Sequence, residues 1–533
     1  MKALDSNIDT QSNSFTDNAQ QMKSLVEQLN GYLQISREQG SEKQVERARK
    51  RNKLLARERI ELVLDKDSPF LELLPLIGLE NKEGFGAGGT NVSGIGLVAG
   101  KMCMINSNVG SRKGGAIDFA TSEKGIRIAE ITLQNKLPTI NLVESGGVNL
   151  PDQDRVFNNA GASFREISRR SKAGLPTLSV VFGNATAGGA YVPGMSDFSI
   201  FQKQAAKVFL AGPPLVKMAT NEVASAEELG GAEMHSRVSG VSDYLAEDER
   251  DGIRIVREIM EVINTSQPHL IPDSPIQPPK YSQEEILGIV PVNPKTPFDV
   301  RELIARITDG SEFSEFKPEY GATLVTGWAK IHGYPVGIVA NNGVIFSESA
   351  NKGTQFIQLS NKNNIPLLFI HNTTGFMVGK NYEEGGIIKN GAKLIHAVSG
   401  SEVPHLSLMV GSSYGAGNYG MSGRSFEPRF LFTYPNAKVS VMGAEQLAGV
   451  MEIVKKQSAK SMGKTIDDKK LNAEKQAMIT DATQKSTSWY SSSEGWDDGV
   501  IDPRETRNYL GFSLAIVYNQ PIKGANTYGI FRM

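Results

Sequence analysis

The sequence contains one cysteine and has almost no net charge. Cys103 is the only thiol in 533 residues, which excludes an internal disulfide framework and a thiolate zinc cluster within one chain. The 57 Lys and Arg residues nearly balance the 58 Asp and Glu residues, and no block of like charge occurs. Because nucleic-acid binding depends on clustered positive charge, we expect no nucleic-acid partner.

Long apolar segments are also missing. No run approaches the roughly 18 to 20 residues that a bilayer span requires. The first nine residues carry Asp5 and Asp9 and contain no hydrophobic stretch of a secretion signal. A reducing compartment fits the scarcity of cysteine. We therefore expect a cytoplasmic protein without a membrane partner.

The usual sequence signatures of metal and ATP sites are incomplete. The six histidines include no pair spaced by three or four residues, the spacing that places two ligands on one helix face. Gly463-Lys464-Thr465 imitates the end of a phosphate-binding loop, but Ser458 stands where the first glycine of that loop belongs. We expect neither a metal ion nor ATP to bind this chain.

Composition and proline positions divide the chain. Residues 1–65 are polar with helical spacing of apolar residues, which predicts two helices in an N-terminal arm. From about residue 90, short Val/Ile/Leu runs alternate with glycine-rich turns and amphipathic stretches, the pattern of an α/β fold. Eight of the 24 prolines lie within 268–297 and predict a linker. The expected units are a helical arm (1–65), an N-terminal domain (66–285) and a C-terminal domain (286–533).

The two halves of the chain repeat each other. Five local patterns recur in the same order, with a nearly constant offset along the chain. They are residues 137–143 with 365–371, 175–181 with 403–409, 186–191 with 414–419, 93–94 with 326–327, and 207–209 with 438–440. The sequence therefore predicts one α/β domain that has been duplicated.

Each half carries a small-residue turn directly after an apolar strand. The strands at 178–182 and 406–410 run into turns that contain Gly188 and Gly189, or Gly415. Backbone N–H groups at the start of a helix have no partner within it, and two of them can hold a negatively charged oxygen. A side chain at these glycines would occupy the space of that oxygen. The competing interpretation is that the glycines only permit close helix packing.

Two other motifs overlap the second turn. Gly415, Gly417 and Gly420 form G-x-G-x-x-G, but the acidic residue of a dinucleotide site is missing about 20 positions later, and the first half lacks the motif. The residues around Ser413 form G-x-S-x-G, but that hydrolase order needs a histidine after the serine, and the last histidine is His405. Two candidate oxyanion holes without an evident nucleophile or base indicate enolate chemistry on a thioester.

At these residues the chain resembles the carboxyltransferase (β) subunit of biotin-dependent acyl-CoA carboxylases, a family with two tandem crotonase-like domains of ββα spiral type. The resemblance extends from about residue 45 to the C-terminus and rests on eight segments. They are residues 53–60, 113–115, 144–147, 186–191, 209–216, 340–343, 372–379 and 414–421. YGAGNYGM at 414–421 and YGIFRM at 528–533 are similar to the methylcrotonyl- and geranyl-CoA carboxylases.

The resemblance implies a ligase component that moves a carboxyl group from carboxybiotin to an acyl-CoA through a thioester enolate. Gly188 and Gly189 would form one oxyanion hole and Gly415 and Ala416 the other, and which hole serves which oxyanion stays open. Biotin would be carried by a separate α subunit that has biotin carboxylase activity, because this chain lacks a Met-Lys-Met attachment signal. Active sites would lie at dimer interfaces of a homo-oligomer, typically a hexamer.

The resemblance also implies which residues contact each substrate. The CoA and acyl side comprises Arg57, Arg59, Lys113, Gly114, Gly115, Ala116, Gly146, Gly147 and Tyr191. The biotin side comprises Thr374, Gly375, Phe376, Tyr414, Gly417 and Tyr419. Guanidinium forks at Arg57 and Arg59 fit CoA phosphates, and the alternative for this pair is a solvated helix face.

The identity of the acyl group stays open. Ala-Ile-Asp-Phe at 116–119 replaces the family's usual Thr-Tyr-Tyr-Pro, and residues 148–153 also depart from the methylcrotonyl pattern. A branched or unsaturated substrate such as 3-methylcrotonyl-CoA is expected. Two alternatives are a biotin-dependent acyl-CoA decarboxylase subunit that works with a membrane partner, and a noncatalytic scaffold that binds acyl-CoA.

Overall fold

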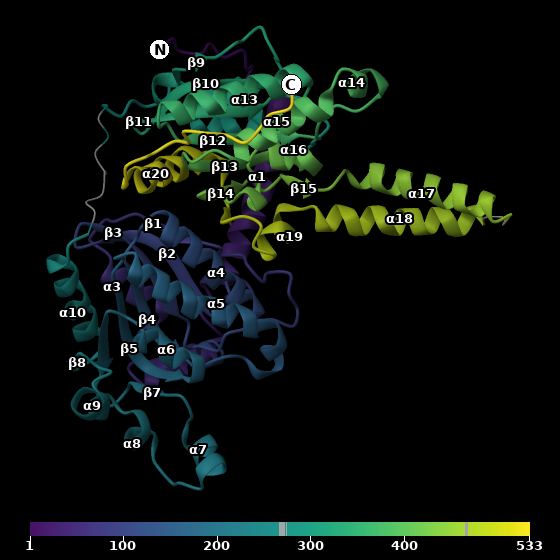
Figure 1. Cartoon of the computed structure of the whole chain (residues 1–533). Helices are drawn as coiled ribbons and strands as arrows, with labels where there is room; N and C mark the ends of the chain where they lie inside the picture. Colours follow the sequence, from purple (N-terminus) through teal and green to yellow (C-terminus); the bar gives the residue numbers. More distant parts are fainter. Residues whose placement is uncertain (266–271, 273, 464–466) are drawn as a thin grey trace.

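The computed structural model describes residues 1–265, 272, 274–463 and 467–533. Figure 1 shows two α/β bodies, an N-terminal one in blue and a C-terminal one in green. The first body ends with α10 (Glu249–Val262), and the chain then continues into the second. Part of the predicted proline-rich linker, including Pro268, lies outside the described residues, as do His269 and Lys464-Thr465 of the phosphate-loop candidate.

The N-terminal body is built on one sheet, which has eight strands within the described residues. The strands are β1 (Phe70–Leu73), β2 (Asn91–Val98), β3 (Lys101–Asn108), β4 (Thr139–Ser145), β5 (Thr177–Thr186), β6 (Phe198–Gln202), β7 (Lys207–Phe209) and β8 (Tyr244–Ala246). Their order is β1-β2-β3-β4-β5-β6-β8, and β7 pairs with β5. The pairs up to β3 are antiparallel and those from β3 onward are parallel.

The C-terminal body repeats this sheet. Its strands in the described part of the chain are β9 (Ser314–Glu315), β10 (Leu324–Ile331), β11 (Tyr334–Asn341), β12 (Leu367–Thr373), β13 (His405–Tyr414), β14 (Phe430–Thr433), β15 (Lys438–Ser440) and β16 (Gly499–Val500). Order and direction are the same, with β15 paired to β13. β5 and β13 have equal lengths, as do β2 and β10, and β7 and β15, and each pair keeps the register found in the sequence. The duplication predicted from the sequence is confirmed.

Alternate residues of a strand face opposite layers of each body. In the first sheet, Ile140 and Leu142 of β4 pack with α10 and α3 (Ala56–Val63) in one apolar cluster. The intervening residues, such as Asn141, face α4 (Phe119–Gln134) and α5 (Gln153–Lys172). In the second sheet the corresponding layers are α13 (Ser347–Lys362) with α15 (Ile387–Ser399), and α20 (Thr506–Tyr518).

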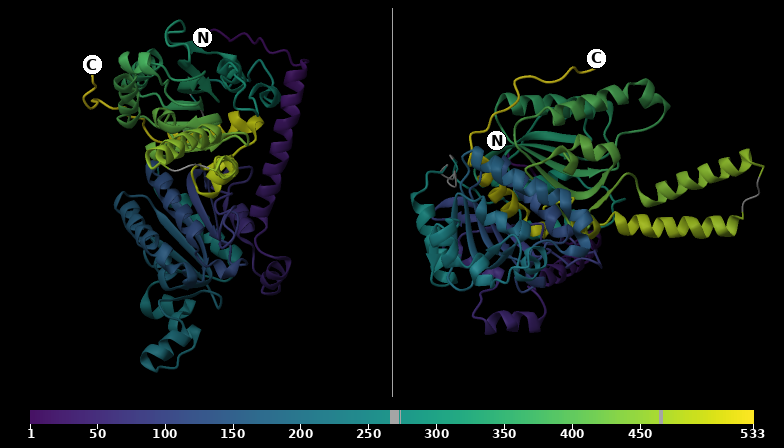
Figure 2. Two further views of the ribbon diagram at one scale, coloured as in Figure 1. Left: turned by 90° about the vertical axis from the view of Figure 1, so that its right-hand side faces the viewer. Right: turned by 60° about the horizontal axis from the view of Figure 1, so that its bottom comes forward.

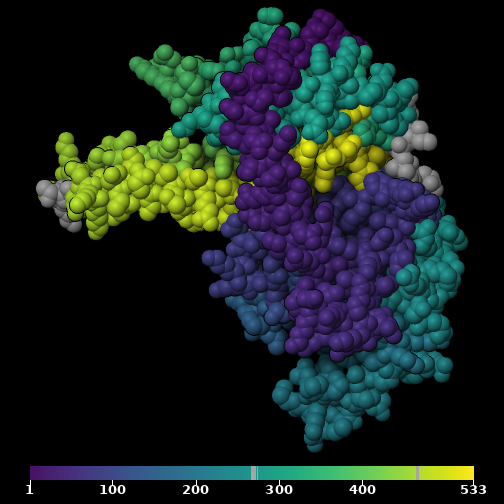
Figure 3. All heavy atoms as spheres, turned by 180° about the vertical axis from the view of Figure 1, so that it is seen from behind, coloured from purple at the N-terminus to yellow at the C-terminus, as the bar shows by residue number. Residues whose placement is uncertain are grey.

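The N-terminal arm has three helices instead of the two that were expected. They are α1 (Asn13–Arg37), α2 (Glu42–Lys50) and α3. Gly40, with φ of 122°, separates α1 from α2. Figure 3 shows α1 lying along the back of both bodies, and its Met22 and Val26 belong to an apolar cluster that also holds residues of both halves. The arm is thus packed on the molecule over most of its length.

The two bodies are joined by packing as well as by the chain. One apolar cluster contains Ile128 of the first half and Leu408 of the second. Arg127 and Asp498 form a buried ion pair across the same boundary, at 2.9 Å. Figure 2 shows the bodies in contact, with α17 (Ala444–Ser461) and α18 (Asp468–Lys485) projecting as a helical pair. None of the helices in the described ranges combines the length and apolar content of a membrane span.

Candidate active site

The two predicted turns have the same backbone bend. β5 runs into the short helix η3 (Ala187–Ala190), and β13 runs into α16 (Gly415–Gly420). Ala187 and Gly415, the first residues of these helices, both have φ of 53°. This left-handed conformation turns each strand abruptly into its helix. The N–H groups that follow lie in a first helical turn, where the helix itself offers them no acceptor.

The space in front of the bends explains the small residues. A Cβ atom at Gly188 would lie 3.4 Å from the ring of Phe164, and one at Gly189 would lie 3.6 Å from the Ser145 side chain. Both positions therefore tolerate a methyl group, whereas a larger side chain would fill the space beside the N–H groups. A Cβ atom at Gly415 would lie 3.0 Å from the carbonyl oxygen of Val441, so both space and conformation favour glycine there.

Gly417 fits the competing interpretation of close packing. A Cβ atom there would lie 2.9 Å from Cα of Gly375, which itself has φ of 124°. α16 therefore packs directly on the turn after β12, which brings Thr374 and Gly375 beside Tyr414 and Gly417. Of the other predicted biotin-side residues, Phe376 packs against Gly391 and Gly420, and Tyr419 stacks on Phe426 while 44% exposed.

A pocket of about 200 Å³ extends from the first bend between α4, α5 and the sheet. We call it the N-terminal pocket. Gly188 and Gly189 line it, and its apolar wall includes Ile117, Ile128, Val143, Val156, Phe164 and Ile167. Tyr191 contacts Phe164 with ring centroids 5.3 Å apart. A mainly apolar pocket that opens at backbone N–H groups can hold an acyl chain with its carbonyl at the bend.

The predicted CoA-side loops meet beside this pocket. The Gly146 N–H donates to the Gly114 carbonyl at 2.9 Å, and the Ile117 N–H donates to the Gly147 carbonyl at 2.8 Å. A Cβ atom at Gly115 would collide with the carbonyl of Glu144. The structure therefore brings residues 113–116 and 146–147 together, as one packed pair of loops.

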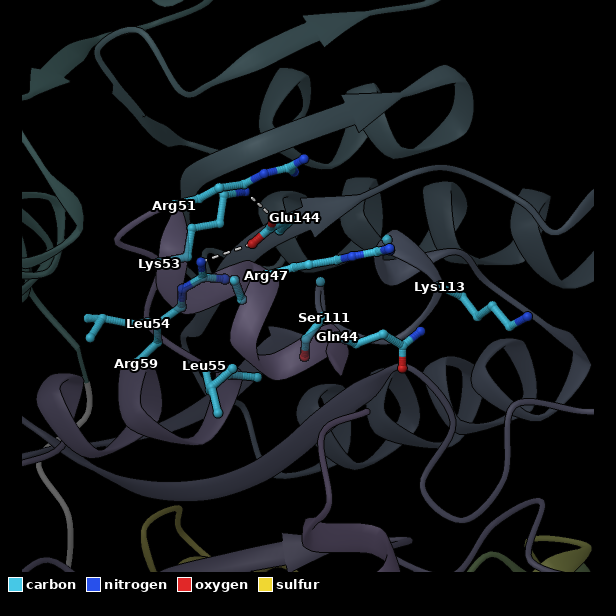
Figure 4. A pocket seen from close by; sticks show the side chains of 14 residues that line it. Gln44, Arg47, Arg51, Lys53, Leu54, Leu55, Arg59, Ser111, Lys113 and Glu144 are labelled. Carbon is cyan, nitrogen blue, oxygen red and sulfur yellow. Dashed lines mark hydrogen bonds and ion pairs between the residues drawn. The ribbon is translucent and has the colours of Figure 1, made fainter. Parts of the chain in front are cut away.

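A second hollow, the basic pocket, lies between α2 and the loop after β3 and has a volume of about 280 Å³ (Figure 4). Arg47, Arg51, Lys53 and Lys113 line it. Arg47 and Arg51 were not among the residues predicted from the sequence, although their spacing of four residues places both on one side of a helix. Clustered guanidinium and ammonium groups of this kind can bind phosphate.

Arg57 and Arg59 are held by carboxylates of this chain. Arg57 makes two hydrogen bonds of 2.7 Å to Glu72. Arg59 is 1% exposed and pairs with Glu249 at 2.7 Å and Glu144 at 2.9 Å. Although burial opposes its charge, these two carboxylates raise the pKa of Arg59. Because both charges are already compensated, Arg47 and Arg51 are the stronger candidates for free phosphate ligands.

The pocket beside Gly415, here the C-terminal pocket, has a volume of about 370 Å³ and a mixed lining that includes several polar side chains. Ser413, Asn418 and Arg424 contribute to it. The Ser413 hydroxyl lies 2.9 Å from Nδ1 of His371 and accepts a hydrogen bond of 2.9 Å from Nδ2 of Asn418.

The contact between Ser413 and His371 was not predicted from the sequence. The hydrolase motif requires a histidine after the serine, and His371 precedes Ser413. Ser413 is fully buried. Burial lowers the pKa of His371 to about 3, so its imidazole is a poor proton acceptor near neutral pH. The pair therefore supports the Gly415 bend and does not have the properties of a nucleophile and its base.

Within the described ranges, no group of three or more His, Cys, Asp or Glu side chains is placed to hold a metal ion.

Comparisons with known proteins agree with this geometry. Residues 47–528 match the family model described as the carboxyl transferase domain. The chain is 51% identical over 531 residues to the probable biotin-dependent acyl-coenzyme A carboxylase beta2 subunit of Mycobacterium tuberculosis, covering 99% of this chain and 100% of that protein. It is 47% identical over 520 residues to the biotin-dependent 3-methylcrotonyl-coenzyme A carboxylase beta1 subunit of the same organism, covering 97% and 98%.

A solved structure is similar over the whole chain. The beta subunit of geranyl-CoA carboxylase from P. aeruginosa superposes with a TM-score of 0.91 at 41% identity, covering 99% of each chain. The duplicated fold, the paired bends and the family model all lead to one assignment. The chain belongs to the carboxyl transferase family, and it is an enzyme of the same type as these carboxylase beta subunits.

Proposed function

We propose that this chain transfers a carboxyl group from carboxybiotin on a partner protein to the enolate of an acyl-CoA. The observation that carries the proposal is the duplicated bend. Ala187 and Gly415 have the same φ, and the backbone N–H groups of the next residues lie in the first turn of a helix. The printed names of the relatives, which are biotin-dependent acyl-CoA carboxylase beta subunits, support the same chemistry.

Two oxyanion holes suit this reaction. Gly188 and Gly189 form one hole, and Gly415 and Ala416 form the other. Negative charge develops on the thioester oxygen when the α- or γ-proton leaves, and on the ureido oxygen of biotin when its carboxyl group departs. Each N–H donor is worth about 3 kcal/mol in a site from which water is excluded. Measuring enolate formation and carboxybiotin breakdown separately will show which hole holds which oxygen.

The N-terminal body is the acyl-CoA side. The basic pocket, with Arg47, Arg51 and Lys113, binds the phosphates of CoA. Gly114 lines the basic pocket and Ile117 lines the N-terminal pocket, so the loop 113–116 connects the phosphate end to the acyl end. The turn 146–147 packs on this loop, and Tyr191 braces Phe164 at the pocket wall.

The C-terminal body is the biotin side. When bound, biotin supplies the carboxyl group and the nitrogen that accepts the substrate proton. Thr374, Gly375 and Phe376 form the turn after β12, and Tyr414, Gly417 and Tyr419 flank the second bend. The polar groups of Asn418 and Arg424 in the lining can hydrogen-bond to a ureido ring, which a hydrocarbon chain cannot use.

The assembly follows from this division of labour. We place each active site between the N-terminal body of one copy and the C-terminal body of another, in a homo-oligomer that we propose to be a hexamer. The biotin carboxylase and the biotin carrier are on a separate α subunit. The first candidate substrate is 3-methylcrotonyl-CoA or another branched, unsaturated acyl-CoA, and the proposed compartment is the cytoplasm.

The test is carboxylation by the purified chain together with its cognate biotin-carrying subunit. ATP, labelled bicarbonate and a panel of acyl-CoA thioesters are supplied, and label in an acid-stable product is counted. Fixation should require both proteins and one class of thioester. Two results would contradict the proposal: no fixation with any thioester by an assembled complex, or acyl-CoA-dependent ATP hydrolysis by this chain alone.

A further inference from the structure

Arg170, in the last turn of α5, is a buried cation without a partner in the part of the chain that the structure describes. Its residue is 7% exposed. Within the described residues its side chain makes no hydrogen bond and no ion pair, and Nε is enclosed without an acceptor. Burial lowers its pKa, and the charge of Glu166, one turn earlier, opposes that shift. Glu166 itself is paired with Arg165 and Arg169, at 2.8 and 3.0 Å.

Arg170 lines the same N-terminal pocket as Gly188 and Gly189. Phe164 marks the end of the pocket at the bend, since its ring is the nearest neighbour of Gly188. Arg170 follows Phe164 by six residues, which is about 9 Å along a helix axis. The pocket therefore runs beneath α5 from the oxyanion hole to this guanidinium.

The sheet side of the same pocket also carries polar side chains. Asn106 donates to Asn141 at 3.2 Å, and Asn141 donates to Ser179 at 3.3 Å. The carbonyl oxygens of the Asn91 and Asn106 side chains are buried without a hydrogen-bond donor. The opposite face of the same strands contributes mainly apolar residues to one cluster, although the buried Ser107 of β3 also lies on that face.

The repeat provides an internal reference for this pocket. In the register of the repeat, Asn106, Asn141 and Arg170 correspond to three apolar residues of the C-terminal half. These are Val339, Phe369 and Val398, which are buried together in one apolar cluster. The same position in the fold is therefore a solid core in one half and a polar-ended pocket in the other.

We infer that the acyl group bound in this pocket ends in a carboxylate, which Arg170 holds at the end opposite the thioester. A buried unpaired guanidinium is costly unless an acceptor completes it, and its planar fork fits a carboxylate with two parallel hydrogen bonds. The inference rests on the proposed function and narrows it. Among the branched or unsaturated acyl-CoA compounds of the proposed function, it favours those with an anionic tail, so that 3-methylcrotonyl-CoA itself would be a poorer substrate than a carboxylate-ended relative.

The first test compares thioesters on the unchanged complex of this chain with its biotin-carrying subunit. A series of 3-methyl-2-enoyl-CoA compounds of equal chain length ends in a methyl, a hydroxyl or a carboxylate group. We expect kcat/KM for the carboxylate-ended compound to exceed that of the methyl-ended one by about tenfold or more. A preference for the methyl end would overturn the inference, whereas carboxylation of no thioester would instead overturn the proposed function.

The second test is Arg170→Met, with Arg169→Met as its matched control. Arg169 is adjacent in sequence, but its side chain is 57% exposed and faces away from the pocket lining. Arg170→Met should lower kcat/KM for the carboxylate-ended compound by about a hundredfold and leave the methyl-ended compound unchanged or improved, whereas Arg169→Met should change neither.

Thermal unfolding separates binding from a structural role. Because removal of an unpaired buried charge does not weaken packing, Arg170→Met should unfold at the same or a higher temperature than the parent. An equal loss on all thioesters, together with a lower unfolding temperature, would show that Arg170 only supports the fold. If Arg170→Met does not assemble, the substrate preference of the unchanged protein still decides the inference.

Discussion

The N-terminal and C-terminal pockets start at the same backbone bend but carry different side chains beside it. The bends at Ala187 and Gly415 share one φ value, yet the first opens on a mainly apolar space of about 200 Å³ and the second on a space of about 370 Å³ to which Ser413, Asn418 and Arg424 add polar groups. Ser413 and Asn418 of the second pocket correspond, in the register of β5 and β13, to Ala185 and Ala190 in the first half. With His371 at the place of Val143, three substitutions of apolar residues by polar ones account for the network around Ser413 at only one bend.

This difference indicates how a duplicated fold can handle two chemically different groups. The backbone supplies the part that both groups share, which is a pair of N–H donors for a negatively charged oxygen. Side chains around the bend supply the part that differs, which is an apolar pocket for an acyl chain or hydrogen-bonding groups for a ring. The following changes break or sharpen that contrast, from the largest expected effect to the smallest.

The largest effect is expected when either bend is filled. Gly188→Val and Gly415→Val should each reduce the rate of carboxyl transfer by about a thousandfold, because the valine side chain keeps the substrate oxygen away from the backbone N–H groups. Partial reactions measure each bend separately: exchange of the acidic thioester proton reports the enolate, and release of CO₂ from carboxybiotin reports the biotin side. Each variant should slow one of the two partial reactions much more than it slows the other.

The control for these variants is Gly449→Ala, in the exposed part of α17, where a Cβ atom would meet nothing within 4 Å. It should transfer carboxyl groups at the parental rate. Full activity of Gly188→Val in an assembled oligomer would remove this glycine from the proposed hole.

A large loss of stability is expected at the boundary between the bodies. Asp498 accepts hydrogen bonds from Arg127 and Arg424, whereas Asp243, at the corresponding place beside β8, is exposed. Asp498→Asn should lower the free energy of unfolding by about 3 to 5 kcal/mol because it removes the buried carboxylate that Arg127 and Arg424 share, which leaves Arg127 with the partly exposed Glu130. Asp243→Asn should cost under about 1 kcal/mol. Denaturant unfolding of both variants checks the contrast, and equal losses would contradict it.

The same pair predicts a pH dependence of stability. Although burial alone would raise it, Arg127 and Arg424 lower the pKa of Asp498 to about 2. A depressed carboxyl pKa stabilises the fold above the unfolded value of about 3.9, and this contribution is lost as the pH falls toward 2. The stability gap between the parent and Asp498→Asn should therefore narrow below about pH 4. A gap that stays constant down to pH 2 would contradict this origin.

A moderate effect is expected in the basic pocket. Arg47→Ser combined with Arg51→Ser should raise KM for the acyl-CoA about tenfold or more with little change in kcat, since phosphate contacts bind substrate and transition state alike. Arg49→Ser is the matched control, because Arg49 pairs with Glu58 and does not line the pocket. Steady-state kinetics at constant ionic strength measure both, and an equal rise in the control would contradict the assignment.

The smallest effect on stability is expected at a core position where both halves have a small buried side chain. Cys103 of β3 is fully buried, and Val336 occupies the corresponding place of β11. Cys103→Val should change the free energy of unfolding by less than about 1.5 kcal/mol, because volume and polarity are nearly kept. Burial raises the pKa of the Cys103 thiol, so the native parent should not react with a thiol reagent and the unfolded parent should react once.

Much of the fold could be predicted because its signals are local and repeated. Patterns such as 175–181 against 403–409 placed the two central strands, and the small residues after them placed both bends. The helical arm was less predictable. The two predicted helices correspond to α1 and α3, and α2 was missed because Val45 and Ala48 are its only apolar residues. Packing of Met22 against both halves depends on long-range contacts.

Partners of the charged site residues could not be predicted in the same way. The sequence places Arg57 and Arg59 on a helix within 53–60, a segment that resembles the carboxylase family. Their partners Glu72, Glu144 and Glu249 come from other elements of the fold. The approach of His371 to Ser413 is likewise made by two neighbouring strands, β12 and β13, and chain order carries no information about it.

From the sequence alone follow the duplication, the α/β class and the positions of both bends, because repeats and strand-to-turn patterns are properties of short segments. Tertiary structure alone decided which guanidinium groups are neutralised, that Arg170 is buried without a partner, and that one half keeps a pocket where the other has a filled core. The physical reason is that charge compensation and cavities depend on side chains brought together from separate strands and helices, which local pattern does not specify.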